Sequence, residues 1–212
     1  MNTLCIYHAR CPDGFGAACV VRRAFGAGHV DFHPGVHQAP PPDCSAREVV
    51  IVDFSYPRPV LLEMAATARS ILVLDHHRSA AADLVDLPAN VSAHFDMERS
   101  GAMLAWDHYF PDREPPALLR HIQDRDLWRF ELEGTREVMA ALSSYPQEFA
   151  VWERLLEGDP QRQRQDGTAI DRFVQKEIAE HIGIAASRMV IAGHDVPVLN
   201  APHSWASDAG AI

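Results

Sequence analysis

The chain has 212 residues, 47% of them hydrophobic, and its 19 basic and 29 acidic residues give a formal net charge of −10. This length fits one large domain, or one domain and part of a second, and the apolar content excludes a disordered chain. The acidic balance argues against coating of duplex DNA by bulk charge. No apolar run reaches the roughly 18 residues of a membrane span, and the N-terminus lacks the segments of a signal peptide, so we expect a cytoplasmic protein without a membrane partner.

The first half of the chain alternates short apolar runs with helical patterns. We expect strands at 3–7, 29–33, 49–52, 70–74 and 91–95, and helices at 15–26, 58–68 and 100–109. The run at 49–52 is continuous and β-branched, as in strands covered on both faces of a parallel sheet. This alternation predicts an α/β fold with a Rossmann-like parallel sheet flanked by helices.

From about residue 115 the pattern becomes helical. Helices are expected at 115–128, 135–142, 147–156 and 162–187. The segment 193–200 is expected to begin a new strand. The sheet is therefore expected to be followed by a helical region and a long linker helix.

Polar residues gather directly after three of the predicted strands. They are His8 with Asp13, then Asp53, and then Asp75, His76 and His77. The carboxyl ends of parallel strands meet at one edge of the sheet, where open α/β sheets bind ligands. Imidazole and carboxylate groups suit Mn, Fe, Co or Zn. Three strands that end in this way predict a site for a divalent metal.

Each of these residues also has a purely structural explanation. A carboxylate after a strand commonly caps the next helix, which is an alternative for Asp13. For Asp53 this is weaker, because Ser55 is the better cap for the helix that Pro57 opens. Adjacent strand side chains point to opposite faces, so the Asp-His-His run converges only if the chain turns into a loop at Arg78.

The ordered motifs resemble a known family. His8-x-x-x-Pro12-Asp13-Gly14, Val52-Asp53-Phe54-Ser55 and Leu74-Asp75-His76-His77 are similar to the motifs of the DHH phosphoesterase superfamily. That superfamily includes RecJ-type exonucleases, nano-RNases, cyclic-dinucleotide phosphodiesterases and family II inorganic pyrophosphatases. The resemblance implies a Rossmann-like metal-binding core at 1–128, a helical extension with a linker helix at 129–188, and the start of a truncated C-terminal domain at 189–212.

The resemblance also implies a metal centre with one or two divalent ions, usually Mn²⁺, with Mg²⁺ or Co²⁺ as alternatives. Position by position, the implied metal ligands are His8, Asp13, Asp53 and His76, with Asp53 bridging the ions. It makes Asp75 the partner of His76, and His77 the imidazole that contacts phosphate. A last ligand is expected from Asp124 or Asp126, with Asp124 slightly favoured.

The chain departs from the family pattern in two places. Many relatives carry Asp-x-Asp in the first motif, whereas this sequence has Arg10 and Cys11 upstream of Asp13, so one carboxylate is absent. The Gly-Gly-Gly-His-type motif of the C-terminal, substrate-gripping domain has no match. Weaker substrate binding is the expected consequence of the second departure.

Three further residues are candidate substrate contacts. Arg10 is expected either to meet a phosphate or to be solvated. Arg99 and Ser100 open a predicted helix whose backbone N–H groups could hold an anion, although a plain cap is favoured over this role. Trp128 is expected to pack in the core rather than to stack on a base. His29, His33 and His37 are expected to be solvated rather than to form a second metal site.

These features predict a metal-dependent phosphoesterase, a hydrolase that cleaves phosphodiester bonds of short nucleotides or oligonucleotides. Two alternatives stay open. One is a phosphomonoesterase or pyrophosphatase with the same metal centre, and the other is an inert metal-binding remnant. A homodimer also stays open.

Overall fold

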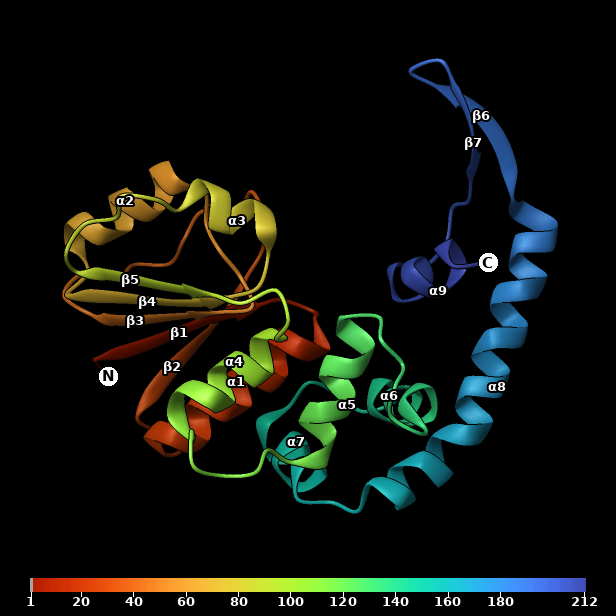
Figure 1. Cartoon of the computed structure of the whole chain (residues 1–212), viewed down its shortest axis with the longest axis horizontal. Coiled ribbons are helices and arrows are strands. Elements are labelled where there is room, and N and C mark those ends of the chain that lie inside the picture. Colours follow the sequence, from red (N-terminus) through yellow and green to blue (C-terminus); the bar gives the residue numbers. More distant parts are fainter. Residues whose placement is uncertain (1) are drawn as a thin grey trace.

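The computed structural model describes residues 2–212 and confirms the expected α/β fold (Figure 1). Its five-stranded sheet consists of β1 (Thr3–His8), β2 (Val30–Gly35), β3 (Glu48–Val52), β4 (Ser70–Asp75) and β5 (Val91–Phe95). All neighbouring strands are parallel, in the order β2-β1-β3-β4-β5. Each strand lies where the apolar runs predicted it.

Helices cover both faces of the sheet. On one face lie α2 (Arg58–Thr67) and α3 (Arg78–Asp83), and on the other lie α1 (Pro12–Phe25) and α4 (Gly101–Tyr109) (Figure 1). Alternate strand residues serve the two faces, as the pleat requires. Ile51 packs in the cluster that contains Leu61 of α2, whereas Val50 and Val52 pack in the cluster that contains Phe15 of α1. Burial on both faces explains the continuous apolar run.

The strand order sets the position of the ligand-binding edge. After β1 the chain first adds β2 on one side and then returns to add β3 on the other. Such a reversal opens a crevice beyond the carboxyl ends of the two central strands. His8 is the last residue of β1, and Asp53 directly follows β3. The fold therefore places both residues at this crevice.

The second half of the chain is mainly helical. It contains α5 (Ala117–Asp126), α6 (Thr135–Ser143), α7 (Phe149–Leu156) and α8 (Pro160–Ala185). α7 joins the sheet domain through aromatic packing, since Phe15 lies 4.9 Å from Phe149 and 5.0 Å from Trp152 between ring centroids. The long helix α8 runs along α6 and then extends away from the sheet (Figure 1).

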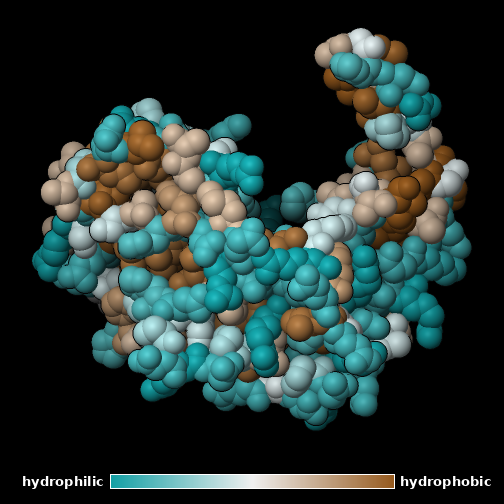
Figure 2. Space-filling model, viewed as in Figure 1, coloured by the Kyte–Doolittle hydropathy of each residue, from teal (hydrophilic) through white to brown (hydrophobic). Residues whose placement is uncertain are grey.

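The C-terminal segment returns toward the helical region. It consists of β6 (Ser187–Ile191), β7 (His194–Val198), the short 3₁₀ helix η1 (His203–Trp205) and α9 (Ala206–Gly210). The antiparallel β6–β7 hairpin projects from the body, with exposed apolar side chains at Met189, Val190 and Ile191 (Figure 2). From α9, Asp208 reaches back to Arg125 of α5, with 3.2 Å between the carboxylate and the guanidinium.

The structure differs from these expectations in three places. The first helix begins at Pro12 rather than at residue 15, because proline suits the first helical position. The loop expected after His77 is the helix α3. The strand expected at 193–200 is present as β7, but β6, which precedes it, was not expected. This strand is exposed throughout, so it carries no burial pattern that a sequence would reveal.

Within residues 2–212, no helix has both the length and the apolar character needed to cross a bilayer.

The contact between α6 and α8 depends on a glycine. A methyl group at Gly167 would overlap the backbone oxygen of Glu137 in α6. We expect Gly167→Ala to separate the two helices and lower the free energy of unfolding by about 1–3 kcal/mol. Gly183 in the same helix has nothing within 4 Å of such a group, so Gly183→Ala should raise stability by about 0.4–1 kcal/mol. Urea unfolding measures both, and equal effects would contradict this packing.

Candidate metal centre

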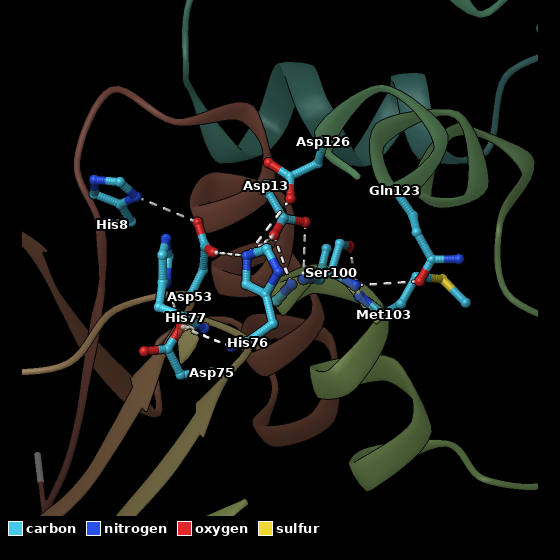
Figure 3. A network of polar contacts seen from close by, with 12 residues as sticks. His8, Asp13, Asp53, Asp75, His76, His77, Ser100, Met103, Gln123 and Asp126 are labelled. Atoms are coloured by element: carbon cyan, nitrogen blue, oxygen red, sulfur yellow. Dashed lines mark hydrogen bonds and ion pairs between the residues drawn. The ribbon is translucent and has the colours of Figure 1, made fainter. Parts of the chain in front are cut away.

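Imidazole and carboxylate groups from five elements meet at the carboxyl edge of the sheet (Figure 3). They are His8 at the end of β1, Asp13 in the first turn of α1, Asp53 after β3, His76 after β4 and Asp126 at the end of α5. These residues are far apart in the sequence. The parallel strands bring His8, Asp53 and His76 together, as their positions at strand ends predicted, and α1 and α5 add Asp13 and Asp126.

Asp53 lies at the middle of this cluster and is 1% exposed. Its Oδ1 is 3.1 Å from Nε2 of His76, and its Oδ2 is 3.5 Å from Nδ1 of His8. A φ of +52° turns the backbone sharply at Asp53. Any side chain at Gly101 would overlap Asp53, so α4 can approach only through a glycine. Burial acts to raise the pKa of Asp53, but the two histidines outweigh it and hold that pKa below its usual range.

Asp13 is buried and links α1 to α4. The backbone N–H groups of Gly101 and Ala102 donate to its carboxylate at 2.5 and 3.0 Å. Asp13 therefore occupies the N-terminus of α4, the position at which the sequence suggested a substrate anion. It does not cap its own helix, because Cys11 holds that position. Burial, together with Asp53 and Asp126, raises the pKa of Asp13 well above its usual range.

The two substrate contacts expected at the start of α4 have other partners. Ser100 is fully buried, and its hydroxyl accepts a hydrogen bond from the backbone N–H of Met103 at 3.4 Å. It is the plain helix cap that the sequence also predicted, and its hydroxyl is occupied by this role. Arg99, which precedes the cap, pairs with Asp107 of α4 at 3.1 Å. Arg10 is exposed, in the turn between β1 and α1, where its φ is +58°.

The structure separates Asp124 from Asp126. Asp126 faces the cluster, with its Oδ2 3.5 Å from Nε2 of His76. Asp124 instead accepts hydrogen bonds from the backbone N–H groups of Glu131 and Leu132 and from the hydroxyl of Thr135, at 2.8, 3.1 and 2.5 Å. Side chains that lie two residues apart on a helix point in different directions. The structure therefore directs Asp126 to the cluster, and not the slightly favoured Asp124, whose carboxylate holds the loop that precedes α6.

Asp75 orients His77 rather than His76. Its Oδ1 lies 2.6 Å from Nδ1 of His77, and the hydroxyl of Ser55 donates to its Oδ2 at 2.6 Å. Ser55 is thus not the cap of α2, which begins after Pro57 without a side-chain cap. The hydrogen bond that Nδ1 of His77 donates to Asp75 raises the pKa of His77 to about 9, although burial opposes it. His77 is therefore a cation at neutral pH, with 42% of its side chain exposed.

The surroundings of three further residues were not predicted from the sequence. The ring of His37 lies 5.3 Å from that of His8, so one of the three histidines expected to be solvated borders the site. Trp128 was expected in the core but is 42% exposed, with the guanidinium of Arg125 4.2 Å above its ring. The third is Cys11, which is partly buried. Burial, Asp53 and Asp13 raise the pKa of its thiol.

The chemistry of the cluster fits divalent cations. The described residues include three sets whose possible ligand atoms lie within 4.8 Å of one another in each set. The sets are Asp53 with Asp75, His76 and His77; His8 with Cys11 and Asp53; and Asp13 with His76 and Asp126. The Oδ2 atom of Asp53 is buried without a hydrogen-bond partner among residues 2–212. Burying a carboxylate oxygen costs free energy unless a hydrogen-bond donor or a cation binds it. A cation there would supply the missing partner and offset the repulsion among the carboxylates.

Comparison with known proteins places the chain beside uncharacterized proteins. No protein-family model matches it. It is 32% identical over 167 residues to an uncharacterized protein of Acanthamoeba polyphaga mimivirus, in a match that covers 72% of this chain and 39% of that protein. The chain thus spans about two fifths of that protein's length. The crystal structure of an uncharacterized protein from Helicobacter pylori has a similar fold, with a TM-score of 0.56 and 12% identity over 82% of this chain and 64% of that one.

The different roles of Asp124 and Asp126 can be tested by two matched variants. Asp124→Asn should lower the free energy of unfolding by about 1–3 kcal/mol, because an amide cannot accept from three donors as the carboxylate does. Asp126→Asn should leave the stability of the metal-free protein unchanged or higher, because it removes a charge that repels Asp53. Its Mn²⁺ affinity should fall instead. Thermal unfolding with chelator and calorimetric Mn²⁺ titration separate the two effects, and the reverse pattern would contradict this assignment.

Metal binding should weaken as the pH falls. Burial and the charge of Asp53 raise the pKa of Asp126 to about 6, and that of Asp13 is raised as well. A cation must displace these protons, so its affinity is lower below pH 6 and rises as the pH passes through it. Calorimetric Mn²⁺ titrations about one unit below and above this pKa, in two buffers that differ in ionisation enthalpy, measure the affinity and the released protons. Unchanged affinity without proton release would contradict the raised pKa values.

Proposed function

We propose that this chain is a divalent-metal-dependent phosphoesterase that hydrolyses phosphodiester bonds of short nucleotides or oligonucleotides. The observation that carries the proposal is the buried carboxylate and imidazole cluster at the carboxyl edge of the sheet (Figure 3). The resemblance of its motifs to those of DHH phosphoesterases supports the reaction class. It also supports Mn²⁺ as the metal, as one or two ions, with Mg²⁺ or Co²⁺ as alternatives.

The groups of the cluster divide into two sets around Asp53. His8 lies beside Oδ2 of Asp53, and His76 lies beside Oδ1. Asp13 and Asp126 complete the set on the His76 side. Divalent cations bound there would polarise phosphoryl oxygens and lower the pKa of an attacking water. The carboxylates alone would repel a phosphate, so the metal-free protein should bind substrate poorly.

His77 is a protein side chain that brings a positive charge to the site. Its pKa of about 9 keeps the imidazole protonated at neutral pH, and Asp75 holds its Nδ1. The other ring N–H is then free to donate to a phosphoryl oxygen and stabilise the charge that develops there. In the hydrolysis, the oxygen of water bonds to phosphorus, the bond from phosphorus to the ester oxygen breaks, and the leaving oxygen departs with a proton.

The charge of the chain and its thiols support the remaining features of the proposal. A net charge of −10 favours a small substrate held at one site over long duplex DNA held by bulk attraction. The four cysteines are free thiols, which supports a reducing, cytoplasmic location.

A panel of substrates tests the proposal. We expect Mn²⁺-dependent cleavage of a 5′-phosphorylated dinucleotide that chelator abolishes. Asp53→Asn should reduce turnover by roughly 100-fold or more, because the site would lose its central carboxylate. Asp112→Asn, an exposed acidic position that none of the three ligand sets includes, serves as the matched control with unchanged turnover.

The same panel separates the alternatives. Cleavage of monoesters or pyrophosphate without cleavage of diesters would favour the phosphomonoesterase or pyrophosphatase. Binding of Mn²⁺ and dinucleotide without turnover would favour an inert metal-binding module. Turnover that persists with chelator or in Asp53→Asn would exclude the metal mechanism.

A further inference from the structure

We propose that Cys11 is a metal ligand and that the candidate centre therefore contains two chemically different sites. The first is a nitrogen, sulfur and oxygen site formed by His8, Cys11 and Asp53. The second is an oxygen-rich site formed by Asp13, His76 and Asp126. This inference deepens the proposed function and rests on the same metal centre.

The geometry places the thiol among ligand atoms. The Sγ of Cys11, a ring nitrogen of His8 and a carboxylate oxygen of Asp53 all lie within 4.8 Å of one another. The left-handed turn at Arg10, with a φ of +58°, carries the chain from β1 back to this position. The carbonyl of Cys11 accepts hydrogen bonds from the backbone N–H of Phe15 at 3.0 Å and from the side chain of Gln147 at 3.3 Å. The backbone that bears the thiol is therefore held in place.

An independent observation points to a ligand at the same place. The Oδ2 atom of Asp53 faces His8 at 3.5 Å and is buried without a hydrogen-bond partner among the described residues. The other oxygen of Asp53 contacts His76. One oxygen of Asp53 is thus engaged on the His76 side, and the other faces the side of His8 and Cys11. A cation held by the thiolate and the imidazole would satisfy this second oxygen.

The other three cysteines differ from Cys11 in their surroundings. Cys5, Cys19 and Cys44 are 0%, 1% and 3% exposed and lie in the two hydrophobic clusters. Cys11 is more exposed than these and belongs to neither cluster. Its neighbours are a histidine and a carboxylate, which are the common partners of cysteine in metal sites.

Charge is balanced once the metals are bound. A cation would have to displace the proton of the Cys11 thiol, as it would those of the carboxylates. Three carboxylates and one thiolate would then carry four negative charges, which balance two divalent cations. A thiolate is a soft ligand that favours Zn²⁺, Co²⁺ or Fe²⁺, whereas carboxylates suit Mn²⁺ and Mg²⁺. We therefore expect the two sites to differ in metal preference.

Cobalt spectroscopy tests the ligand directly, without measuring activity. Wild-type protein loaded with Co²⁺ should show a near-ultraviolet thiolate-to-cobalt charge-transfer band. Cys11→Ala should lose this band and keep the visible d–d absorption of cobalt bound by the remaining ligands. Cys11→Asp should bind Co²⁺ through a carboxylate without the band, which guards against a variant that merely fails to fold. Cys44→Ala, which removes a distant thiol, should retain the band.

A competition titration adds a second readout. Cys11→Ala should lower Zn²⁺ affinity by more than about tenfold, since even outer-shell partners of metal ligands commonly cost that much. Its Mn²⁺ affinity at the carboxylate-rich site should change less.

The possible failures are distinguishable. Visible cobalt absorption without a charge-transfer band in the wild type, or a band that survives in Cys11→Ala, would overturn the role of Cys11 and leave the proposed function intact. A wild-type protein that binds no cobalt would overturn both. A charge-transfer band that depends on Cys11, in a protein that cleaves no phosphoester, would support the ligand and overturn only the proposed function.

Discussion

The rest of the site is arranged around the negative charge that Asp53 carries within the protein. Its carboxylate is 1% exposed, and two histidines lie beside it, one from β1 and one after β4. The positive φ of Asp53 aims the side chain at the crevice, and Gly101 lets α4 approach closely enough to close it. Each of these features costs stability by itself. Their presence together supports the proposal that the site holds a ligand.

Asp13 and Asp126 increase the free-energy cost of burying charge at this site. Both lie beside Asp53, and both have raised pKa values because burial and like charge disfavour their ionised forms. The fold compensates only in part, through the backbone N–H groups at the N-terminus of α4 that donate to Asp13. Perturbed titration in a crevice is typical of functional sites. Here a divalent cation is the simplest group that would relieve all three carboxylates.

Most of the fold and part of the site could be predicted from the sequence. The apolar runs predicted all five strands, because burial on both faces leaves a strong local signal, and the strand ends then located His8, Asp53 and His76. Asp124 and Asp126 could not be separated, since their roles depend on how α5 turns against the sheet. Cys11 and His37 also escaped, because neither has a local pattern. His37 reaches the site only through the path of a proline-rich loop.

The ion pair between α9 and α5 ties the end of the chain to the centre of the molecule. Asp208 binds Arg125, whose neighbour in sequence is Asp126, and it also lies 3.6 Å from Arg136 of α6. A segment more than 80 residues downstream thus holds the helix end that presents a carboxylate to the cluster. Any coupling between α9 and that carboxylate would act in both directions, so an occupant of the cluster would also change how tightly α9 is held. The ion pairs of Asp208 give the C-terminal arm this physical route to the centre, although the hairpin between α8 and α9 stands apart from the sheet.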